Sequence, residues 1–349
     1  MAFKAFISGC ATTALTTAER DLFAAERPCG LILFRRNVEN PGQVQALVSD
    51  FKQAVGTEDV LVLIDQEGGR VQRLRPPFWR EMPPAQVFGD LYAKDEFAGR
   101  RAAFAAARLM AAELHDLGIN VDCAPCIDVR HPGAHDIIGD RAFSTDPQTV
   151  AVLGRAVMNG MLAGGVLPVI KHVPGHGRAL ADSHKSLPHI DVSRDALEAV
   201  DFLPFRELQD APLAMTAHVL LPAYDERNPA TLSPAIMKEV IRDQLGLTGL
   251  IMTDDICMKA LSGTPGELTH AVIEAGCDVA LHCSGKFDEM VDVAGAAPEL
   301  AGESLDRFEN AFACLYDPEP FDEAEAMALV NEAAAIRVAE VGADPTEQV

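Results

Sequence analysis

The densest group of potentially reactive side chains lies between positions 171 and 184. This stretch contains Lys171-His-Val-Pro-Gly-His-Gly177 and then Asp182-Ser-His184. A carboxylate this close to an imidazole can fix its tautomer and stabilise its protonated form, so Asp182 and His184 are candidates for an acid–base pair. A metal site built from the histidines at 172, 176 and 184 is one alternative, although they lack the helical spacing of zinc proteases. A solvated loop without a catalytic role is the other.

Two adjacent carboxylates, in Thr253-Asp254-Asp255, follow the apolar residues of a short segment. If that segment is a strand, successive side chains point to opposite sides, so one carboxylate faces the interior and the other turns outward or caps the next helix. A carboxylate in such a position can act as a covalent nucleophile toward a sugar. The pattern alone does not distinguish Asp254 from Asp255.

A third group, Asp65-Gln-Glu-Gly-Gly-Arg-Val-Gln-Arg73, combines two carboxylates, two glycines and two arginines within nine residues. The glycines allow a positive φ and a close approach of the backbone to a ligand. The arginines can balance the acids or bind hydroxyl groups. The segment lacks the G-x-x-x-x-G-K-[ST] pattern, so it is not a phosphate-binding loop of that kind.

Short apolar segments alternate with longer segments of helical periodicity along the chain. Strands are expected over Phe3–Ile7, Gly30–Phe34, Val60–Asp65, Ile119–Ala124, Val166–Lys171, Leu213–Thr216, Leu250–Thr253 and Val279–Cys283. Most lack strict alternation of polar and apolar residues, which is typical of strands covered on both faces. Helices are expected over Ala102–Leu117, Val150–Leu162, Pro234–Leu245 and Pro265–Ala275, several of them ending at a glycine. Eight such units predict an α/β fold, a single (β/α)8 barrel of the TIM type, with a doubly wound sheet as the alternative.

In such a barrel the catalytic groups lie at the carboxyl ends of the strands, where the loops converge. The expected strand ends are unusually polar: they carry Asp65, Asp122 and Asp128, Lys171 and His172, Thr216 and His218, Asp254 and Asp255, and His282. A single aspartate after a strand is often only a helix N-cap. Because six strands share this feature, we expect a site at that end of the barrel.

The composition is that of a globular protein with a sizeable core, since 48% of the 349 residues are hydrophobic and 23% are charged. The formal net charge of −23 disfavours binding to nucleic acid or to an anionic membrane surface. The expected partner is therefore a small ligand that is neutral or held locally against this field. No linker divides the chain, so we expect one catalytic domain over residues 1–349. Its acidic extension, about 317–349, is expected to contain a helix over Glu323–Val341 and a solvated end without a chemical role.

The expected location is the cytoplasm. Eight cysteines are scattered along the chain without the spacing of a disulfide framework, and Cys123-Ala-Pro-Cys126 lacks a second pair for a zinc site. No apolar run approaches the roughly 20 residues of a membrane span. The start of the chain carries the Ile7-Ser-Gly-Cys10 of a lipoprotein signal, but its apolar part is too short for a secretory signal. We expect a first strand there instead.

At these residues the sequence resembles glycoside hydrolase family 3, and within it the bacterial cytoplasmic β-N-acetylhexosaminidases of peptidoglycan recycling. The matching stretches run in family order across about the first 285 residues. They are Gly30-Leu-Ile-Leu-Phe-Arg-Arg-Asn37, Asp65–Arg73, Ala124-Pro125 with Asp128, Gly139-Asp-Arg141, Lys171–Gly177, Ala181-Asp-Ser-His-Lys185, Ala217-His218 and Gly249–Asp255. The combination of Lys171–Gly177 with the Asp-Ser-His-Lys stretch is the most specific match.

The resemblance implies a role for each matching residue. Asp254 corresponds to the nucleophile of the family, His184 to its acid/base, and Asp182 to the partner of that histidine. The positions that bind the N-acetylglucosaminyl unit correspond to Asp65, Arg73, Arg141, Lys171 and His172. The family fold in this branch is a single (β/α)8 barrel. The sequence departs from the family at Val173, where phenylalanine is usual, and in Thr253-Asp-Asp-Ile-Cys-Met258, where Ser-Asp-Asp-Leu-Ser-Met is usual. These departures concern the fit of the sugar and the mobility of the loop, and they leave the ionisable groups intact.

The resemblance therefore implies a retaining exo-β-N-acetylglucosaminidase that removes terminal, non-reducing β-linked N-acetylglucosamine from muropeptide fragments. The reaction would pass through a covalent glycosyl-enzyme intermediate, without a metal or cofactor. A β-glucosidase or an N-acetylglucosaminide phosphorylase on the same fold is the alternative. A metal-dependent hydrolase and a non-catalytic sugar-binding protein are more distant alternatives, and the latter has little reason to carry both Asp254 and the Asp182–His184 pair. The sequence leaves the oligomeric state and the exact aglycone open.

Overall fold

The computed structural model describes residues 2–336, 344 and 346. Eight parallel strands close into a barrel in the order β1-β10-β9-β8-β7-β6-β3-β2. Their bounds are β1 (Lys4–Ser8), β2 (Pro28–Leu33), β3 (Leu61–Ile64), β6 (Val121–Asp122), β7 (Leu167–Val173), β8 (Leu213–Thr216), β9 (Leu250–Asp255) and β10 (Val279–His282). Every predicted strand matches one of these, with ends that differ by at most two residues. The predicted (β/α)8 barrel is confirmed, and the doubly wound sheet is excluded.

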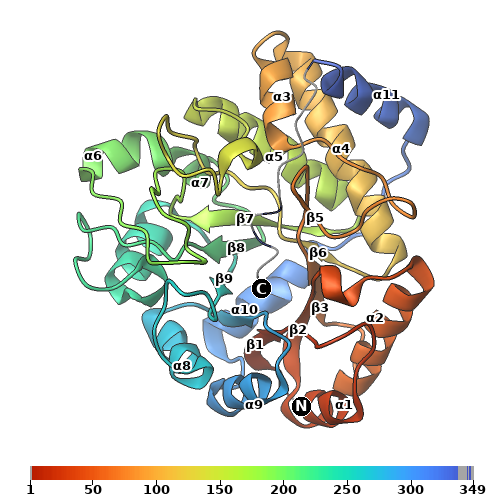
Figure 1. Ribbon diagram of the computed structural model, residues 1–349, viewed down its shortest axis with the longest axis vertical. Coiled ribbons are helices and arrows are strands. Elements are labelled where there is room, and N and C mark those ends of the chain that lie inside the picture. Colours follow the sequence, from red (N-terminus) through yellow and green to blue (C-terminus); the bar gives the residue numbers. More distant parts are fainter. Residues whose placement is uncertain (1, 337–343, 345, 347–349) are drawn as a thin grey trace.

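Helices surround the strands in a ring (Figure 1). The α-helices are α1 (Thr17–Glu26), α2 (Pro41–Val55), α3 (Ala85–Tyr92), α4 (Glu96–Asp116), α5 (Pro147–Ala163), α6 (Arg194–Ala196), α7 (Leu203–Glu207), α8 (Pro265–Ala275), α9 (Phe287–Ala296), α10 (Gly302–Phe312) and α11 (Glu323–Ala334). Short 3-10 turns are η1 (Arg35–Asn37), η2 (Gly139–Arg141) and η4 (Ala230–Leu232), and wider π-type turns form η3 (Leu197–Asp201) and η5 (Ile236–Gln244). In the described part of the chain, no helix has both the length and the apolar character that crossing a membrane requires.

Local signals set the helix ends. The helix α8 has the predicted bounds because Thr264 and Glu267 form a reciprocal capping box and Gly276 ends it in the left-handed conformation. The helix α4 begins six residues before its predicted start, because the Asp95 side chain accepts the first free backbone N–H groups. The cap at Gly276 ends α8 shortly before β10 begins at Val279.

The strands are apolar on both faces because two layers cover them. In β3, Leu61 and Leu63 belong to the cluster that fills the barrel, whereas Val62 and Ile64 belong to the cluster between the barrel and the helices. All four side chains are fully buried. Side chains that alternate between two apolar layers explain why the sequence shows continuous apolar runs instead of polar–apolar alternation.

A small hairpin extends the carboxyl end of β3. Its strands are β4 (Gln66–Gly68) and β5 (Val71–Gln72), which pair antiparallel. Gly68 and Gly69 connect them with φ angles of +90° and +58°, and an added Cβ would lie 2.6 Å from Pro83 O or from Pro84 Cβ. Both glycines thus adopt the positive φ that this residue type allows. The hairpin returns the chain from Asp65 to Arg73, which places both side chains at the same end of the barrel.

The acidic extension begins with a helix that packs onto the barrel. The helix α11 lies beside α4 (Figure 1), and its Ala326, Val330 and Ala333 are buried in the same core cluster as the outer barrel layer. The predicted helix over Glu323–Val341 begins at the expected residue, but its end was wrong: it stops at Ala334, and a turn follows at 335 and 336. Positions 337–341 of that prediction lie outside the described residues.

Candidate active site

Seven of the eight predicted site residues line one cavity at the carboxyl ends of the strands. They are Asp65, Arg73, Arg141, Lys171, His172, His184 and Asp254. The eighth, Asp182, is hydrogen-bonded to His184. The structure therefore brings together side chains from the loops that follow β3, β6, β7 and β9.

Asp65 is the centre of the first group of charges. Its two carboxylate oxygens receive Lys171 Nζ at 2.9 Å and Arg73 Nη2 at 2.9 Å. Both cationic side chains are only 2% exposed. Burial alone would raise the pKa of Asp65, but the charges of Lys171 and Arg73 outweigh burial and lower it below the usual range. Asp65 is therefore ionised, and its charge holds both cations in place.

Glu67 forms the second group and was not among the predicted site residues. Both of its oxygens accept from the Arg141 guanidinium, at 2.9 and 2.8 Å, and Lys171 Nζ lies 2.6 Å from Oε1. Burial would raise the pKa of Glu67, but Arg141 and Lys171 lower it to about 2. Lys171 thus bridges two carboxylates, and the signal for the second one was present in the sequence, where Glu67 follows Asp65 by two residues.

Asp128, at the end of the chain segment that follows β6, fixes the start of the histidine loop. Its Oδ2 lies 2.6 Å from His172 Nδ1, and its Oδ1 accepts the His176 backbone N–H at 2.6 Å. Burial opposes ionisation of Asp128, but His172 and then His176 lower its pKa to about 2. The Nε2 atom of His172 lies 3.4 Å from Arg141 Nη2, on the side of the cavity. Asp128 therefore orients the His172 ring toward the site.

Asp182 and His184, the residues predicted to act as an acid–base pair, contact each other. His184 Nδ1 lies 3.0 Å from Asp182 Oδ1, which also accepts the His184 backbone N–H at 2.9 Å. Burial would raise the pKa of Asp182, but these hydrogen bonds and the charge of His184 lower it. Lys185 Nζ lies 3.4 Å from the other oxygen. An ionised Asp182 therefore orients the imidazole through Nδ1 and leaves Nε2 free of this contact.

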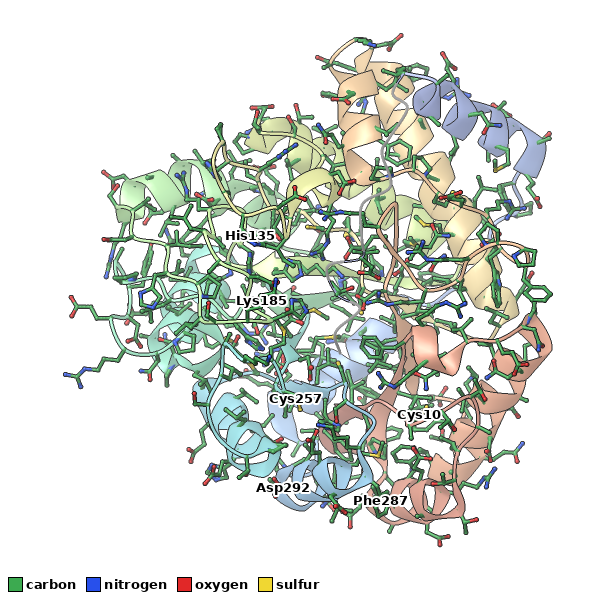
Figure 2. All side chains as sticks on the ribbon, in the orientation of Figure 1. Cys10, His135, Lys185, Cys257, Phe287 and Asp292 are labelled. Atoms are coloured by element: carbon green, nitrogen blue, oxygen red, sulfur yellow. The ribbon has the colours of Figure 1, made fainter. Side chains whose placement is uncertain are left out.

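The loop that carries this pair is attached to its surroundings. Asp201 of η3 accepts from Arg178 Nε at 2.7 Å and lies 3.0 Å from His131 Nε2. The Ala260 backbone N–H donates to Ser183 O at 3.2 Å, which joins the loops after β7 and β9. Figure 2 labels one residue of each of these two loops, Lys185 and Cys257. The loop after β7 is thus held next to the loop that follows Asp254.

The two adjacent aspartates have different surroundings. Burial would raise the pKa of Asp254, but the nearby His172, His218 and His184 lower it below its usual value. Asp255 is buried, and its Oδ1 accepts the backbone N–H groups of Cys257 and Cys283, both at 3.1 Å. Burial raises the pKa of Asp255 to about 7. Asp254 is the carboxylate surrounded by histidines, whereas Asp255 fixes the backbone of two loops.

Other polar strand ends have structural roles. Asp122 accepts the Gln66 backbone N–H at 2.9 Å. His218 is fully buried, with Nδ1 2.8 Å from Thr231 Oγ1 and Nε2 3.0 Å from Asp255 O. His282 contacts Ser284 Oγ at 3.0 Å. None of these residues lines the cavity, so the polar strand ends do not all form a single site.

The three histidines of the metal alternative have three different partners. His172 is paired with Asp128, His184 with Asp182, and His176 Nε2 lies 3.3 Å from Ser183 Oγ. Within the described ranges, two groups bring three potential ligand atoms within 4.8 Å of one another: Cys126 with Asp128 and His172, and Cys257 with His282 and Glu289. Neither group includes Asp254 or His184, so an ion at either would not replace the acid–base pair.

The acidic extension contributes to the cavity. Arg73 Nη1 lies 2.5 Å from Asp344 Oδ2, and Arg73 Nη2 donates to Thr346 Oγ1 at 2.7 Å. The Asp344 carboxylate is only 7% exposed, and Thr346 lines the cavity. The prediction of a solvated end is therefore wrong at Asp344, whose carboxylate is buried against Arg73. Asp344 is 271 residues away from Arg73 in the sequence, so a local sequence pattern could not predict this contact.

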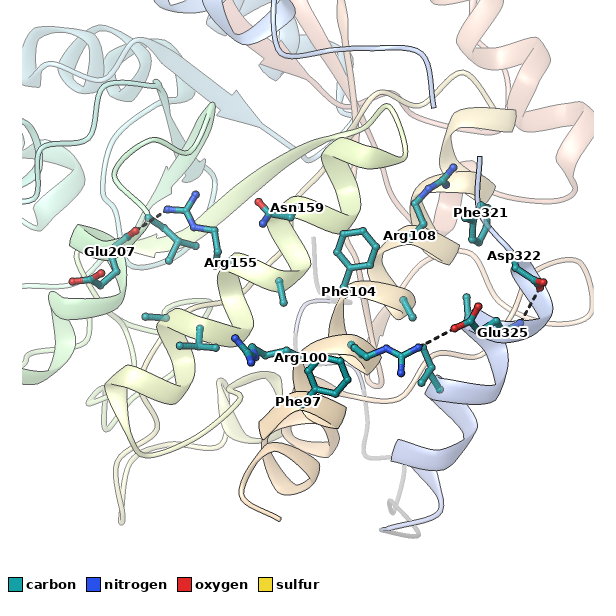
Figure 3. Close-up of a pocket in the computed structure, with 18 of the residues that line it drawn as sticks. Phe97, Arg100, Phe104, Arg108, Arg155, Asn159, Glu207, Phe321, Asp322 and Glu325 are labelled. Carbon is teal, nitrogen blue, oxygen red and sulfur yellow. Dashed lines mark hydrogen bonds and ion pairs between the residues drawn. The ribbon is translucent and has the colours of Figure 1, made fainter. Parts of the chain in front are cut away.

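A larger cavity, of about 800 Å³, lies outside the barrel between α4, α5 and α11 (Figure 3). Its charged groups are largely paired: Arg101 Nη2 lies 2.8 Å from Glu325 Oε1, and Arg155 donates to Glu207 O at 2.7 Å. No predicted site residue lines it. The predicted site residues therefore lie at the smaller cavity at the strand ends.

Residues 9–311 match the Glycosyl hydrolase family 3 N terminal domain. The chain is 41% identical over 312 residues to the Beta-hexosaminidase of Thioalkalivibrio sulfidiphilus, covering 88% of this chain and 83% of that protein. It is 40% identical over 280 residues to the Beta-hexosaminidase of Alkalilimnicola ehrlichii, covering 79% of each. The structure of NagZ from Neisseria gonorrhoeae in complex with N-trifluoroacetyl-D-glucosamine is similar, with a TM-score of 0.86 and 30% identity over 96% of this chain and 99% of that chain.

Proposed function

The chain belongs to glycoside hydrolase family 3, and from this premise we propose that it is a retaining exo-β-N-acetylglucosaminidase. It is a glycoside hydrolase of the β-hexosaminidase type, similar to NagZ. The observation that carries the finer proposal is the single cavity at the strand ends, which holds Asp254, His184 and the charged network around Lys171. Retention requires a nucleophile and a proton donor at the same anomeric carbon, and this cavity contains a candidate for each.

Asp254 is the proposed nucleophile. Three histidines lower its pKa, so it is an ionised carboxylate at neutral pH. In the first step one of its oxygens attacks the anomeric carbon while the bond to the leaving oxygen breaks, which gives a covalent glycosyl-enzyme. Water then displaces Asp254 from the same carbon. Asp254 is preferred to Asp255 because Oδ1 of Asp255 already accepts two backbone N–H groups, so that carboxylate is engaged in holding the backbone.

His184 is the proposed acid/base. It would protonate the leaving oxygen in the first step and remove a proton from the attacking water in the second. Because Nδ1 faces Asp182, Nε2 is the nitrogen that would carry the transferred proton. Asp182 is a positioning residue, since its carboxylate fixes the tautomer and the orientation of the His184 ring.

The charged network is the proposed binding site for the sugar hydroxyls and the acetamido group. Asp65 holds Arg73 and Lys171 by ion pairs. Glu67 holds Arg141, and Asp128 orients His172. Because these groups are fixed before the substrate arrives, they need little reorganisation as positive charge develops at the anomeric carbon. Hydrogen bonds from this network would strengthen in the transition state and so contribute to kcat.

The natural substrates are proposed to be peptidoglycan fragments with N-acetylglucosamine at the non-reducing end. The proposal also covers a cytoplasmic location, which is supported by eight cysteines that are all free thiols. The barrel and α11 are proposed to work as one catalytic unit, because Ala326 and Val330 of α11 belong to the core cluster around the barrel.

A turnover assay tests the proposed function. Aryl β-N-acetylglucosaminide and aryl β-glucoside are compared with and without inorganic phosphate, and the anomeric configuration of the first product is followed by NMR. We expect hydrolysis of the N-acetylglucosaminide with a β product, no requirement for phosphate, and little activity on the glucoside. The rates of hydrolysis of peptidoglycan fragments and of chitobiose are then compared, to identify the preferred aglycone.

The matched control pair is Asp254→Asn and Asp210→Asn. Asp210 is an exposed acid that pairs with Arg155 on the outer helices, so its amide variant should keep wild-type activity. Preferred turnover of the glucoside, an α product, or a sugar phosphate as the main product would each replace the proposal by another activity on the same fold.

A further inference from the structure

Arg73 has two sets of partners in the cavity. On one side Nη2 donates to Asp65 at 2.9 Å, as part of the charged network. On the other side its guanidinium contacts Asp344 Oδ2 at 2.5 Å and Thr346 Oγ1 at 2.7 Å. The Arg73 side chain is 2% exposed, so both sets of contacts lie away from bulk solvent. A residue proposed to bind the sugar is therefore already bound by the chain itself.

Asp344 and Thr346 form a small, internally ordered unit. The Thr346 backbone N–H donates to Asp344 Oδ1 at 2.8 Å, and the Thr346 hydroxyl donates to the same oxygen at 2.7 Å. This turn leaves Oδ2 of Asp344 and a lone pair of the Thr346 hydroxyl directed at the two terminal nitrogens of Arg73. A guanidinium binds two neighbouring oxygen atoms in this way when it takes a carboxylate or two adjacent hydroxyls.

The cavity is too small for a sugar while these residues occupy it. Its free volume is about 40 Å³, and Thr346 is part of its lining together with Asp254 and His184. Sites for small organic ligands usually enclose roughly 300–1,000 Å³. The remaining space therefore holds a few water molecules, and the residues that line it, Thr346 among them, must move before an N-acetylhexosamine can enter.

We propose that Asp344 and Thr346 are an internal ligand of the sugar site, which competes with the substrate for Arg73. The inference rests on the proposed function, because it takes Arg73 to be a sugar-binding residue. Each enzyme molecule then exists in two states, one with the internal ligand bound and one open to substrate. Only the open state binds substrate, so the apparent KM rises by the ratio of closed to open molecules while kcat stays the same.

Three variants test the competition in steady-state kinetics. The first chain ends at Ile336, the second carries Asp344→Ala with Thr346→Ala, and the third carries Asp317→Ala, which removes an exposed acidic charge from the same extension. With a closed-to-open ratio of about 10, the first two variants should lower KM for an aryl β-N-acetylglucosaminide about 10-fold at unchanged kcat. The third should match the wild type. An unchanged KM in the first two variants would overturn the inference, and a raised KM would mean that these residues help to bind the substrate.

A binding experiment separates this inference from the proposed function. A synthetic peptide of residues 337–349 is titrated into the chain that ends at Ile336, and binding is followed by calorimetry. We expect saturable binding that Arg73→Ala abolishes, together with competitive inhibition of turnover. If the peptide binds but no glycoside is cleaved, the proposed function fails while the internal ligand stands. If glycosides are cleaved and the peptide does not bind, the internal ligand is wrong and the proposed function stands.

Discussion

The Nδ1 atom of His184 lies 3.0 Å from Asp182 Oδ1, and the same oxygen accepts the His184 backbone N–H at 2.9 Å. One carboxylate oxygen therefore fixes both the ring and the backbone of the residue that carries it. The His184 side chain is 12% exposed, so Nε2 can reach a ligand that enters the cavity. This arrangement suits a proton donor that must keep one orientation through two successive proton transfers.

The first prediction concerns the dependence of His184 on the leaving group. A proton donor matters most when the leaving group is a poor one. His184→Ala should therefore reduce kcat/KM for a disaccharide by about 100-fold or more, but much less for aryl glycosides with acidic phenols. The measurement is kcat/KM across phenols of graded acidity.

Asp182→Ala serves as the companion variant. It removes the orienting carboxylate and leaves the imidazole, so the same dependence on the leaving group should appear in a milder form. An equal loss for every leaving group, in either variant, would mean that the residue binds the sugar or holds the loop, and that the proton donor is another residue.

The second prediction distinguishes the two adjacent aspartates. Asp254→Ala removes the proposed nucleophile and should lower kcat by several powers of ten, out of total enzymatic accelerations of about 10⁶–10¹⁷. Asp255→Asn should keep most of the activity of the molecules that fold, because Asp255 contacts backbone N–H groups. A mechanism-based fluorinated glycoside followed by mass spectrometry should label Asp254. A label on Asp255 would reverse the assignment.

The sequence was sufficient for the barrel and for much of the site. Eight apolar segments predicted the strands, because a strand buried on both faces has a continuous apolar sequence. Asp65, Lys171 and Asp254 were then predicted as site residues because they lie at the ends of these strands, and all three line the cavity. The choice between Asp254 and Asp255 could not be made from the alternation of side chains. It depends on which histidines and which backbone N–H groups surround each carboxylate, and these come from distant segments.

Two participants were missed for different physical reasons. Glu67 lies in a motif that was recognised, but its partners Arg141 and Lys171 are 74 and 104 residues away, so only the folded chain shows that it is enclosed by two cations. Asp344 lies in an acidic segment, and acidic segments are usually solvated. Its contact with Arg73 joins two positions 271 residues apart, and hydrophobic periodicity carries no signal for such a contact.

The third prediction concerns the stability of the Glu67–Arg141 pair. The two side chains are 7% and 4% exposed, and removing one partner from a buried pair leaves an uncompensated charge. Glu67→Gln should lower the free energy of unfolding by about 3–5 kcal/mol. In a double-mutant cycle with Arg141→Gln, the combined loss should be smaller than the sum of the single losses. Urea unfolding monitored by circular dichroism measures all four proteins.

The exposed pair of Arg155 and Asp210 provides the matched control for this cycle. Its side chains are 33% and 64% exposed, so its removal should cost no more than about 1 kcal/mol. If Glu67→Gln costs no more than this control, the buried network does not depend on the charge of Glu67.

The fourth prediction concerns metal removal. The proposed reaction uses only side chains, so turnover of an aryl β-N-acetylglucosaminide should be unchanged after exhaustive dialysis against a chelator. The readout is the initial rate before dialysis, after dialysis, and after addition of zinc. A loss that zinc restores would identify a bound ion as part of the active enzyme and would reopen the metal alternative for the histidine loop.

The last prediction concerns pH and His176. This side chain is 3% exposed, and burial lowers its pKa to about 4, from an ordinary value of about 6.5. Above pH 6.5 the imidazole is neutral in both the folded and the unfolded chain, so it adds no pH dependence. As the pH falls toward 4, the unfolded chain takes up a proton that the folded chain excludes, and the folded state loses stability. At pH 5 this loss amounts to about 2 kcal/mol.

His176→Gln keeps a group that can bond to Ser183 and removes the titration. The difference in unfolding free energy between the wild type and His176→Gln, measured in urea at pH 7.5 and pH 5, should therefore shift by about that amount in favour of the variant at the lower pH. Parallel curves for the two proteins would show that His176 titrates alike in the folded and unfolded chains, and that the enclosure of this ring by Asp128 and Ser183 does not exclude its proton.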